Sequence, residues 1–387
     1  MILKTISDLP QLQTLRVFWE NWQRHPNSDF ALFRLVCDLR SEVLRPHVIS
    51  AERQGHSCAL LMCRLERTHI VPRIGYFSRL RVPAVVLAVI HKGLIGKADR
   101  ETAHLMVREL WELLSKGAAD AVSFHHLSED SPLLEALLAD APRWWCQKKP
   151  VWSVHRAMVL MDEPGFLLKN LRSKHRTWIR RKQRDLDADF PGKVSWTWIK
   201  HFDDIPGLCA RIDRFVTRTY QRGLGAGFVD DEDHRRRFAL FADRGQLRVL
   251  VLEIGGDIKA FWIGILYCEI FHLWTTGYDP DLRDYELGTL SFVRMTDELV
   301  NEGVRKIDFG LGDAHYKQRF AHESWRETTV TMFAPTLKGF LLRSLLGMSV
   351  FLDRAGRRLL EKMGFLDRLK TALRRRMLST GTGTGEK

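Results

Sequence analysis

The stretch Trp274–Phe320 reads WTTGYDPDLRDYELGTLSFVRMTDELVNEGVRKIDFGLGDAHYKQRF and is the most informative part of the chain. An apolar strand is expected to end at Gly277, a polar loop leads to Gly288, and a helix and a second strand follow. This order places a helix N-terminus beside a strand end, where backbone N–H groups and the helix dipole favour an anionic group. The residues after the second strand lie where α/β proteins often place functional side chains. The pattern indicates a transferase that uses a phosphate-bearing donor.

The elements on either side of this stretch are expected to occur in the same order twice. In the first half, periodicity and turn residues predict helices over 12–22, 30–43, 100–116 and 131–138, two strands within 48–65 joined at Gln54-Gly55, and strands over 81–90 and 121–127. In the second half they predict helices over 165–186, 205–222 and 288–301 and strands over 247–254, 258–266, 270–276 and 304–309. The repeated order predicts an internal structural duplication.

The net charge of +13 indicates an anionic partner, and the excess is concentrated in two segments with helical periodicity. Residues 169–184 contain eight Lys and Arg and no acid. A solvated helix face would explain this run, and so would binding of nucleic acid, lipid headgroups or a phosphorylated carrier. Residues 337–377 read as two basic amphipathic helices broken near Gly364. They fit an interfacial helix on an anionic inner leaflet and packing against the body of the protein equally well.

The cysteines and the N-terminal segment predict the compartment. Cys58 and Cys63 are five positions apart on an expected strand, so they face opposite sides, and none of the six cysteines has metal-ligand spacing. The first twenty residues lack the apolar segment of a secretory signal, and no apolar run approaches the roughly 20 residues that span a bilayer. The sequence predicts a reduced, cytoplasmic protein without a metal cofactor, either soluble or peripheral on the inner membrane.

The motifs of the second half, taken in chain order, resemble a known superfamily. They are Arg172…Arg176…Ile179-Arg180-Arg181, Gly255-Gly256-Asp257, Gly277-Tyr278-Asp279-Pro280, Gly288-Thr289, Ile307-Asp308-Phe309 and Gly312-Asp313…Tyr316-Lys317…Arg319-Phe320. This series resembles the GNAT acyltransferase superfamily, and within it the Fem-type and CelD-like branch with two GNAT-like halves. The resemblance covers residues 165–333, and the first half shares it only through element order and the hairpin at Gln54-Gly55.

The resemblance implies an α/β (α+β) fold of tandem GNAT-like halves, each a mixed, mostly antiparallel twisted sheet flanked by helices. The expected parts are a degenerate half at 1–160, a catalytic half at 161–335 and a basic amphipathic helical tail at 336–378. The composition of 379–387 predicts a disordered end. The implied reaction moves an acyl group from acetyl-CoA or another acyl-CoA to an amine or hydroxyl of a cell-envelope, polysaccharide or lipid intermediate. The expected acyl group is acetyl.

Side chains at the strand and helix ends are the candidates for this chemistry. Asp308 is expected to orient or deprotonate the acceptor, and a buried carboxylate there has a raised pKa unless Lys317 or Arg319 pairs with it. Tyr316 is expected to protonate the leaving thiolate, and Lys317 to bind donor phosphate or stabilise an oxyanion. The donor is expected to contact Gly288, Thr289, Lys317 and Arg319, and the acceptor Trp274, Tyr278 and Asp313.

Each of these residues also has a purely structural interpretation. Asp308 fits a salt bridge, and Asp313 after Gly312 fits a helix cap. Tyr316 and Lys317 fit a solvated helix face with one packed aromatic ring, and Trp274 fits the core.

The donor loop departs from the pattern of the superfamily. The pyrophosphate loop, Gln/Arg-x-x-Gly-x-Gly/Ala, would fall on Tyr285–Leu290, where only Gly288 fits and Glu286 introduces a negative charge. Two rival functions therefore stay open. One is an aminoacyl-tRNA-dependent transferase, as in Fem-type relatives, which the basic segments favour. The other is a non-catalytic scaffold at a membrane surface that keeps the fold without the chemistry.

Overall fold

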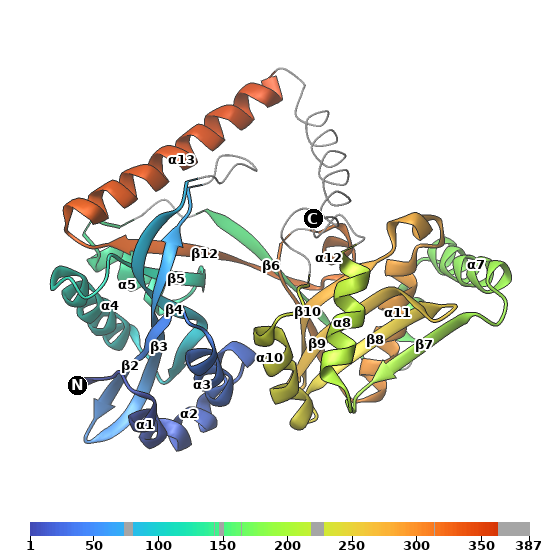
Figure 1. The fold of residues 1–387 in the computed structure, drawn as a ribbon, viewed down its shortest axis with the longest axis horizontal. Coiled ribbons are helices and arrows are strands. Elements are labelled where there is room, and N and C mark those ends of the chain that lie inside the picture. The colour runs from blue at the N-terminus through green and yellow to red at the C-terminus, as the bar shows by residue number, and fades with distance from the viewer. Residues whose placement is uncertain are drawn as a thin grey trace, which may run out of the picture. The chain divides into compact units, whose positions relative to one another are not determined.

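The computed structural model describes residues 1–72, 80–142, 144–146, 151–163, 165–217, 228–312 and 314–362 (Figure 1). The chain forms two compact units. Unit 1 consists of Met1–Val154 together with the chain from Trp325 to the end of the described part, and unit 2 consists of His155–Ser324. Asp313, Gly364 and the tail at 379–387, which carry expectations from the sequence, lie outside the described residues.

Three helices of unit 1, α1, α3 and α4, have starts that are set by aspartate caps. The side chains of Asp8, Asp29 and Asp99 accept the backbone N–H of the residue three positions later, which satisfies an amide that the helix leaves unpaired. The helical elements of unit 1 are α1 (Leu9–Leu12), η1 (Gln13–Leu15), α2 (Arg16–Trp22), η2 (Pro26–Ser28), α3 (Phe30–Leu39), α4 (Arg100–Ser115), α5 (Pro132–Asp140) and α13 (Leu337–Lys362).

The sheet of unit 1 has the strand order β1-β2-β3-β4-β5-β12. The pairs are antiparallel where β1, β2, β3 and β4 follow one another and parallel between β4 and β5. The expected turn at Gln54-Gly55 is confirmed, with φ of 51° and 80°. The strands are β1 (Ile2–Ile6), β2 (Val43–Arg53), β3 (His56–Ile70), β4 (Val82–Gly96), β5 (Ala121–Ser128) and β12 (Glu323–Phe333).

Helices cover both faces of this sheet because its long strands alternate between two cores. On β3, Leu60 packs with Trp19 and Phe33 of α2 and α3, whereas Leu61 packs in the cluster that includes Leu110 of α4. This alternation is the period of two that a strand imposes on its side chains. The C-terminal β12 completes the sheet by pairing antiparallel with β5, a pairing that the sequence did not indicate.

Unit 2 contains a second set of helices, which differs from expectation in two places. The single basic helix expected over 165–186 is two helices, because Leu171 and Arg172 have extended backbone ψ values of 148° and 142°. Helix α10 was not expected. The helical elements are α6 (Phe166–Asn170), α7 (Ser173–Asp189), α8 (Ile205–Val216), α10 (Glu232–Asp243), η3 (Pro280–Tyr285), α11 (Leu287–Asn301) and α12 (His315–Phe320).

The sheet of unit 2 has the strand order β6-β11-β10-β9-β8-β7. Its pairs are antiparallel except for β10 and β11, which run parallel. The expected turn at Gly255-Gly256 has φ of 62° and 85°, the left-handed values that a tight hairpin requires. The strands are β6 (Trp152–Val159), β7 (Val194–Ile199), β8 (Leu247–Ile254), β9 (Asp257–Tyr267), β10 (Ile270–Tyr278) and β11 (Lys306–Leu311).

The core of unit 2 lies on both sides of β9. Phe261 packs edge-to-face on Phe215 of α8, with ring centroids 5.8 Å apart. The next residue, Trp262, faces α11, where its Nε1 donates to Oγ of Ser291 at 2.9 Å. Each unit is thus a mixed, mostly antiparallel sheet flanked by helices, which confirms the expected fold class.

Helix α13 packs on unit 1 through Leu342 and Leu346, which belong to a cluster with Val86 and Phe333. It is one continuous helix from Leu337 to Lys362. Within the described ranges, no helix is both long and apolar enough to cross a membrane.

Candidate active site

Strands β10 and β11 of unit 2 pair in parallel over a short stretch and then part. Their register runs from Ile270 opposite Lys306 to His272 opposite Asp308. Beyond that point β10 has an irregularity in its pairing with β9, and β11 has one between Asp308 and Gly310 in its pairing with β6. We call the place where the two strands part, marked by His272 and Asp308, the strand fork.

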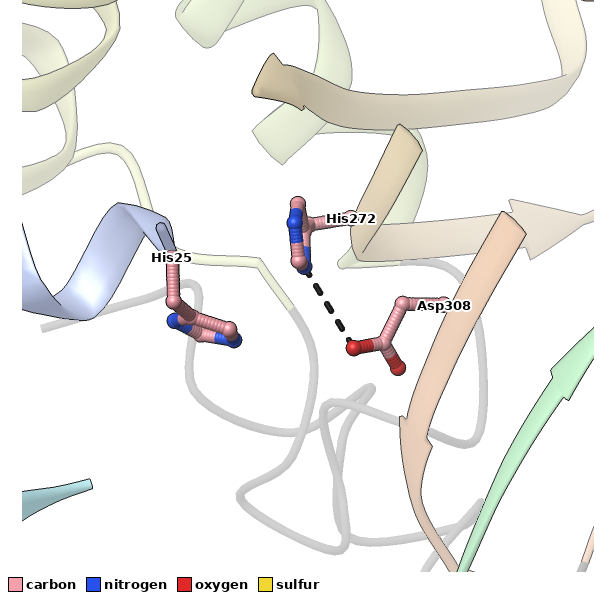
Figure 2. Close-up of side chains that lie close together, drawn as sticks. All are labelled: His25, His272 and Asp308. Carbon is pink, nitrogen blue, oxygen red and sulfur yellow. Dashed lines mark ion pairs between the residues drawn. The ribbon is translucent and has the colours of Figure 1, made fainter. Parts of the chain in front are cut away.

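The carboxylate of Asp308 lies between two histidines at the fork. Nε2 of His155, on β6, is 2.5 Å from Oδ1, and Nδ1 of His272, on β10, is 3.4 Å from Oδ2. Figure 2 shows the second of these pairs, with His272 and Asp308 pointing toward each other from neighbouring strands; His25, also labelled there, belongs to unit 1. Oδ1 also accepts the backbone N–H of Gly310 at 2.8 Å. Asp308 therefore orients imidazole rings and holds the turn after it.

The electrostatics of Asp308 differ from the sequence expectation. Burial is the largest effect and by itself raises the pKa of this carboxyl, but hydrogen bonds and charge from His155 and His272 outweigh it and hold the pKa well below its usual range. The partners are histidines and not Lys317 or Arg319. Asp308 thus stays ionised near neutral pH, and an imidazole is the group at the fork that is suited to take up a proton.

Neither histidine was identified from the sequence. His272 is a polar residue within an otherwise apolar strand, which is a weak signal on its own. His155 gave no signal, because it reaches Asp308 only through the pairing of β6 with β11.

Lys317 lies on α12, just after β11, and its amine points inward. Nζ donates to the carbonyl oxygens of Phe309 and Leu311, at 2.6 Å each. Burial lowers the pKa of Lys317, and the charge of Asp308 acts in the opposite direction. The backbone of β11 holds the amine of Lys317. This geometry favours a role of Lys317 in fixing the strand end over a role in binding donor phosphate.

Tyr316 is packed beside the same strand end. Its ring makes edge-to-face contacts with Trp262 and Phe309, with centroids 5.5 Å and 5.9 Å away. Burial raises the pKa of its hydroxyl, so the group stays protonated and can act as a hydrogen-bond donor.

The expected donor loop is formed at the start of α11. Glu286 caps the helix with φ of 56°, and its Oε2 accepts from Oγ1 of Thr289 at 3.3 Å. A Cβ added to Gly288 would lie 3.3 Å from Cδ1 of Tyr278, so these two residues are in contact at the end of β10. The structure thus brings Gly288, Thr289 and Tyr278 together, with the carboxylate of Glu286 beside them.

Two other candidates lie against helices. Nη2 of Arg319 is 2.8 Å from Nε2 of His175, and the guanidinium is 5.8 Å from the ring of Trp178, so Arg319 contacts α7. The ring of Trp274 packs on α10, with Phe238 at 5.4 Å and the guanidinium of Arg237 at 5.0 Å. The structural interpretation of Trp274 is thereby favoured.

A cavity of about 350 Å³ lies between α7 and α11 on the α11 side of the sheet. Its lining is mostly apolar, with charged groups from Arg180, Arg294 and Asp297. Burial raises the pKa of Asp297, whose Oδ1 accepts from the backbone N–H of Gly165 at 3.2 Å. The other lining residues are Leu168, Ile179, Gln183, Trp196, Leu290 and Val293.

Comparisons with known proteins agree with this architecture. Residues 173–318 match the model of the acetyltransferase (GNAT) domain. The structure of FemX is similar with a TM-score of 0.52 and 10% identity, over 85% of this chain and 97% of that chain. A tandem GNAT protein from the clavulanic acid biosynthesis pathway is similar with a TM-score of 0.51 and 12% identity, over 87% of this chain and 99% of that chain. No curated protein matches the chain. Residues 173–318 are thus similar to a GNAT domain, and the fold of the chain is GNAT-like and Fem-type, with two halves.

Proposed function

We propose that this protein of GNAT-like, Fem-type fold is an acyltransferase that moves an acyl group from a CoA-type thioester to an amine or hydroxyl. The observation that carries the proposal is the paired His272 and Asp308 at the strand fork, within the segment that matches the GNAT domain. A fork between parallel strands exposes backbone groups that no longer pair with each other, and the ionised Asp308 beside it orients a proton acceptor.

In the proposed reaction the acceptor attacks the thioester carbonyl directly. His272, oriented by Asp308, takes the proton of the attacking amine or hydroxyl, the new C–N or C–O bond forms, and the C–S bond breaks. Tyr316 donates a hydrogen bond to the departing sulfur, and the proton held by His272 returns through solvent to give the free thiol. Lys317 positions the end of β11 through its two carbonyl contacts. No acyl-enzyme forms.

The first turn of α11 is the proposed donor site. Gly288 and Thr289 are in this turn, where backbone N–H groups and the helix dipole favour phosphate. Tyr278, which is 44% exposed and touches Gly288, is the proposed wall of the acceptor site. In keeping with the resemblance, the proposed acceptor is a cell-envelope, polysaccharide or lipid intermediate.

An aminoacyl-tRNA donor is the second candidate, and the charge distribution on α7 favours it. Arg176, Arg180 and Arg184 are four residues apart, so they form a row along the helix. Within the part of the chain that the structure describes, none of the three forms an ion pair. The carboxylate of Glu286 at the donor loop also opposes a pyrophosphate there.

The test combines donor binding with donor cleavage. Calorimetry measures binding of acetyl-CoA, a long-chain acyl-CoA and free CoA, and a thiol reagent measures CoA release. Asp308→Asn and His272→Gln are compared with Asp140→Asn, a matched control because Asp140 pairs with His104 of unit 1 at 2.7 Å. We expect the two fork variants to lower CoA release about 100-fold with little change in donor affinity, because general base catalysis typically contributes that much. The control is expected to retain the parent rate.

The donor site is tested with Gly288→Trp, which is expected to abolish binding of every CoA species. Folded protein that binds no CoA species would reject the CoA-dependent reaction. In that case aminoacyl-tRNA binding with a steep dependence on salt, lost in an Arg176→Glu and Arg180→Glu double variant, would establish the second candidate. If the protein binds neither donor, the remaining interpretation is a non-catalytic scaffold at a membrane surface.

A further inference from the structure

Helix α13 carries a row of large apolar side chains that unit 1 does not cover. Three are in its first two turns and three are further along. Their exposed fractions are 77% for Leu337, 49% for Phe340, 52% for Leu341, 55% for Met348, 69% for Phe351 and 43% for Leu352.

These six side chains lie on one side of the helix. At 3.6 residues per turn their positions fall within about 120° of the circumference. The side that packs on unit 1 is a different one, since Leu342 is only 1% exposed and Leu346 joins the same cluster. The sequence left two interpretations open for this segment, packing against the body of the protein and binding to a membrane surface. Both can hold, because α13 has one apolar side for each. We call the exposed row the outer face of α13.

The charges on α13 indicate the chemistry of its partner. Arg343 and Arg354 are next to the outer face, and neither forms an ion pair within the described ranges. Lys338 pairs with Asp120 at 2.7 Å. Apolar side chains flanked by unpaired cations complement a surface that is apolar inside and anionic outside.

We propose that the outer face of α13 docks the protein on an anionic lipid surface. The six apolar side chains enter the boundary between headgroups and acyl chains, while Arg343 and Arg354 contact lipid phosphates. The helix lies along the surface, consistent with the finding that no described helix can cross a bilayer. The inference is independent of the transferase reaction, because vesicle binding needs neither donor nor turnover.

The experiment is co-sedimentation of the full chain with vesicles of phosphatidylglycerol and phosphatidylcholine, compared with pure phosphatidylcholine. The expected result is binding to the anionic vesicles that weakens as salt is raised. A Phe340→Ser and Phe351→Ser double variant is expected to lose about tenfold or more in affinity, and Arg343→Glu with Arg354→Glu a similar factor. Val17→Ser, which removes a 74% exposed apolar side chain from α2, is the matched control and is expected to bind like the parent.

The variants change exposed side chains, apart from the partly exposed Arg343, so circular dichroism and thermal unfolding should match those of the parent. Three outcomes would overturn the proposal. The first is no preference for anionic vesicles, and the second is binding that the outer-face substitutions leave unchanged. The third is a parent protein that is dimeric in light scattering and becomes monomeric in the Phe340 and Phe351 double variant, since a second copy of the chain would then cover the outer face.

Discussion

His155 and Asp308 are 153 residues apart in the chain, yet Nε2 of the first is 2.5 Å from Oδ1 of the second. The contact exists because β6 is inserted beside β11 in the sheet of unit 2. Burial alone would raise the pKa of the Asp308 carboxyl. The contact with His155 helps to keep Asp308 ionised, and the ionised carboxylate orients the imidazole.

The stability contributed by Asp308 is expected to depend on pH. Its pKa is lower in the folded than in the unfolded chain, so the contribution is complete above the ordinary value of about 3.9 and is lost as pH falls toward the folded pKa. Asp308→Asn should lower the free energy of unfolding by about 1–3 kcal/mol near neutral pH. Urea unfolding of parent and variant at several pH values measures this. A difference that stays constant into acid would contradict the assignment.

Lys317 is expected to give a pH dependence of the same sign, but at alkaline pH. Its burial lowers the pKa in the folded chain, so the unfolded chain binds more protons between that pKa and the ordinary value of about 10.4. The parent should therefore gain stability relative to Lys317→Met as pH rises through this window. Denaturant unfolding at neutral pH and at about pH 9.5 measures the change. If the parent instead lost stability relative to the variant, the charged ammonium of Lys317 would be stabilised in the folded protein. That result would contradict the prediction.

Two glycines on helices are expected to respond differently to alanine. Gly347 in α13 has open space around the added methyl, so Gly347→Ala should stabilise the protein by about 0.5–1 kcal/mol through helix propensity. At Gly288 the methyl would meet Cδ1 of Tyr278 at 3.3 Å, which offsets that gain. Thermal unfolding compares the two. If Gly288 marks the donor site, its variant should also bind the donor more weakly, whereas Gly347→Ala should bind like the parent.

Thiol reactivity is expected to follow burial. Cys268 is exposed in the turn between β9 and β10, whereas burial raises the pKa of Cys37 to about 12 and that of Cys209 to about 12. Because the thiolate is the reactive form, native protein treated with N-ethylmaleimide should be modified at Cys268 long before the other two. Mass spectrometry of the peptides measures the order, and unfolded protein, where all thiols react, is the control. Equal rates at Cys37 and Cys268 in folded protein would be inconsistent with the structure.

Much of the fold was predictable because its signals are local. The hairpins at Gln54-Gly55 and Gly255-Gly256 follow from turn residues that adopt positive φ. The order of β10, α11 and β11 follows from apolar periodicity and glycine punctuation. Boundaries were less accurate: the strand expected over 304–309 is Lys306–Leu311, and the helix expected over 165–186 is broken at Leu171 and Arg172.

The sequence by itself determined the type and order of most elements, the basic character of α7 and α13, and the placement of Asp308 on a short strand after α11. Only the tertiary structure decided that β12 pairs with β5 and that β6 brings His155 to Asp308. It also decided that the pKa of Asp308 falls and that the amine of Lys317 is held by the carbonyls of β11. Backbone conformation depends on neighbours in the chain, whereas strand pairing and pKa depend on neighbours in space, which can be separated by 153 positions.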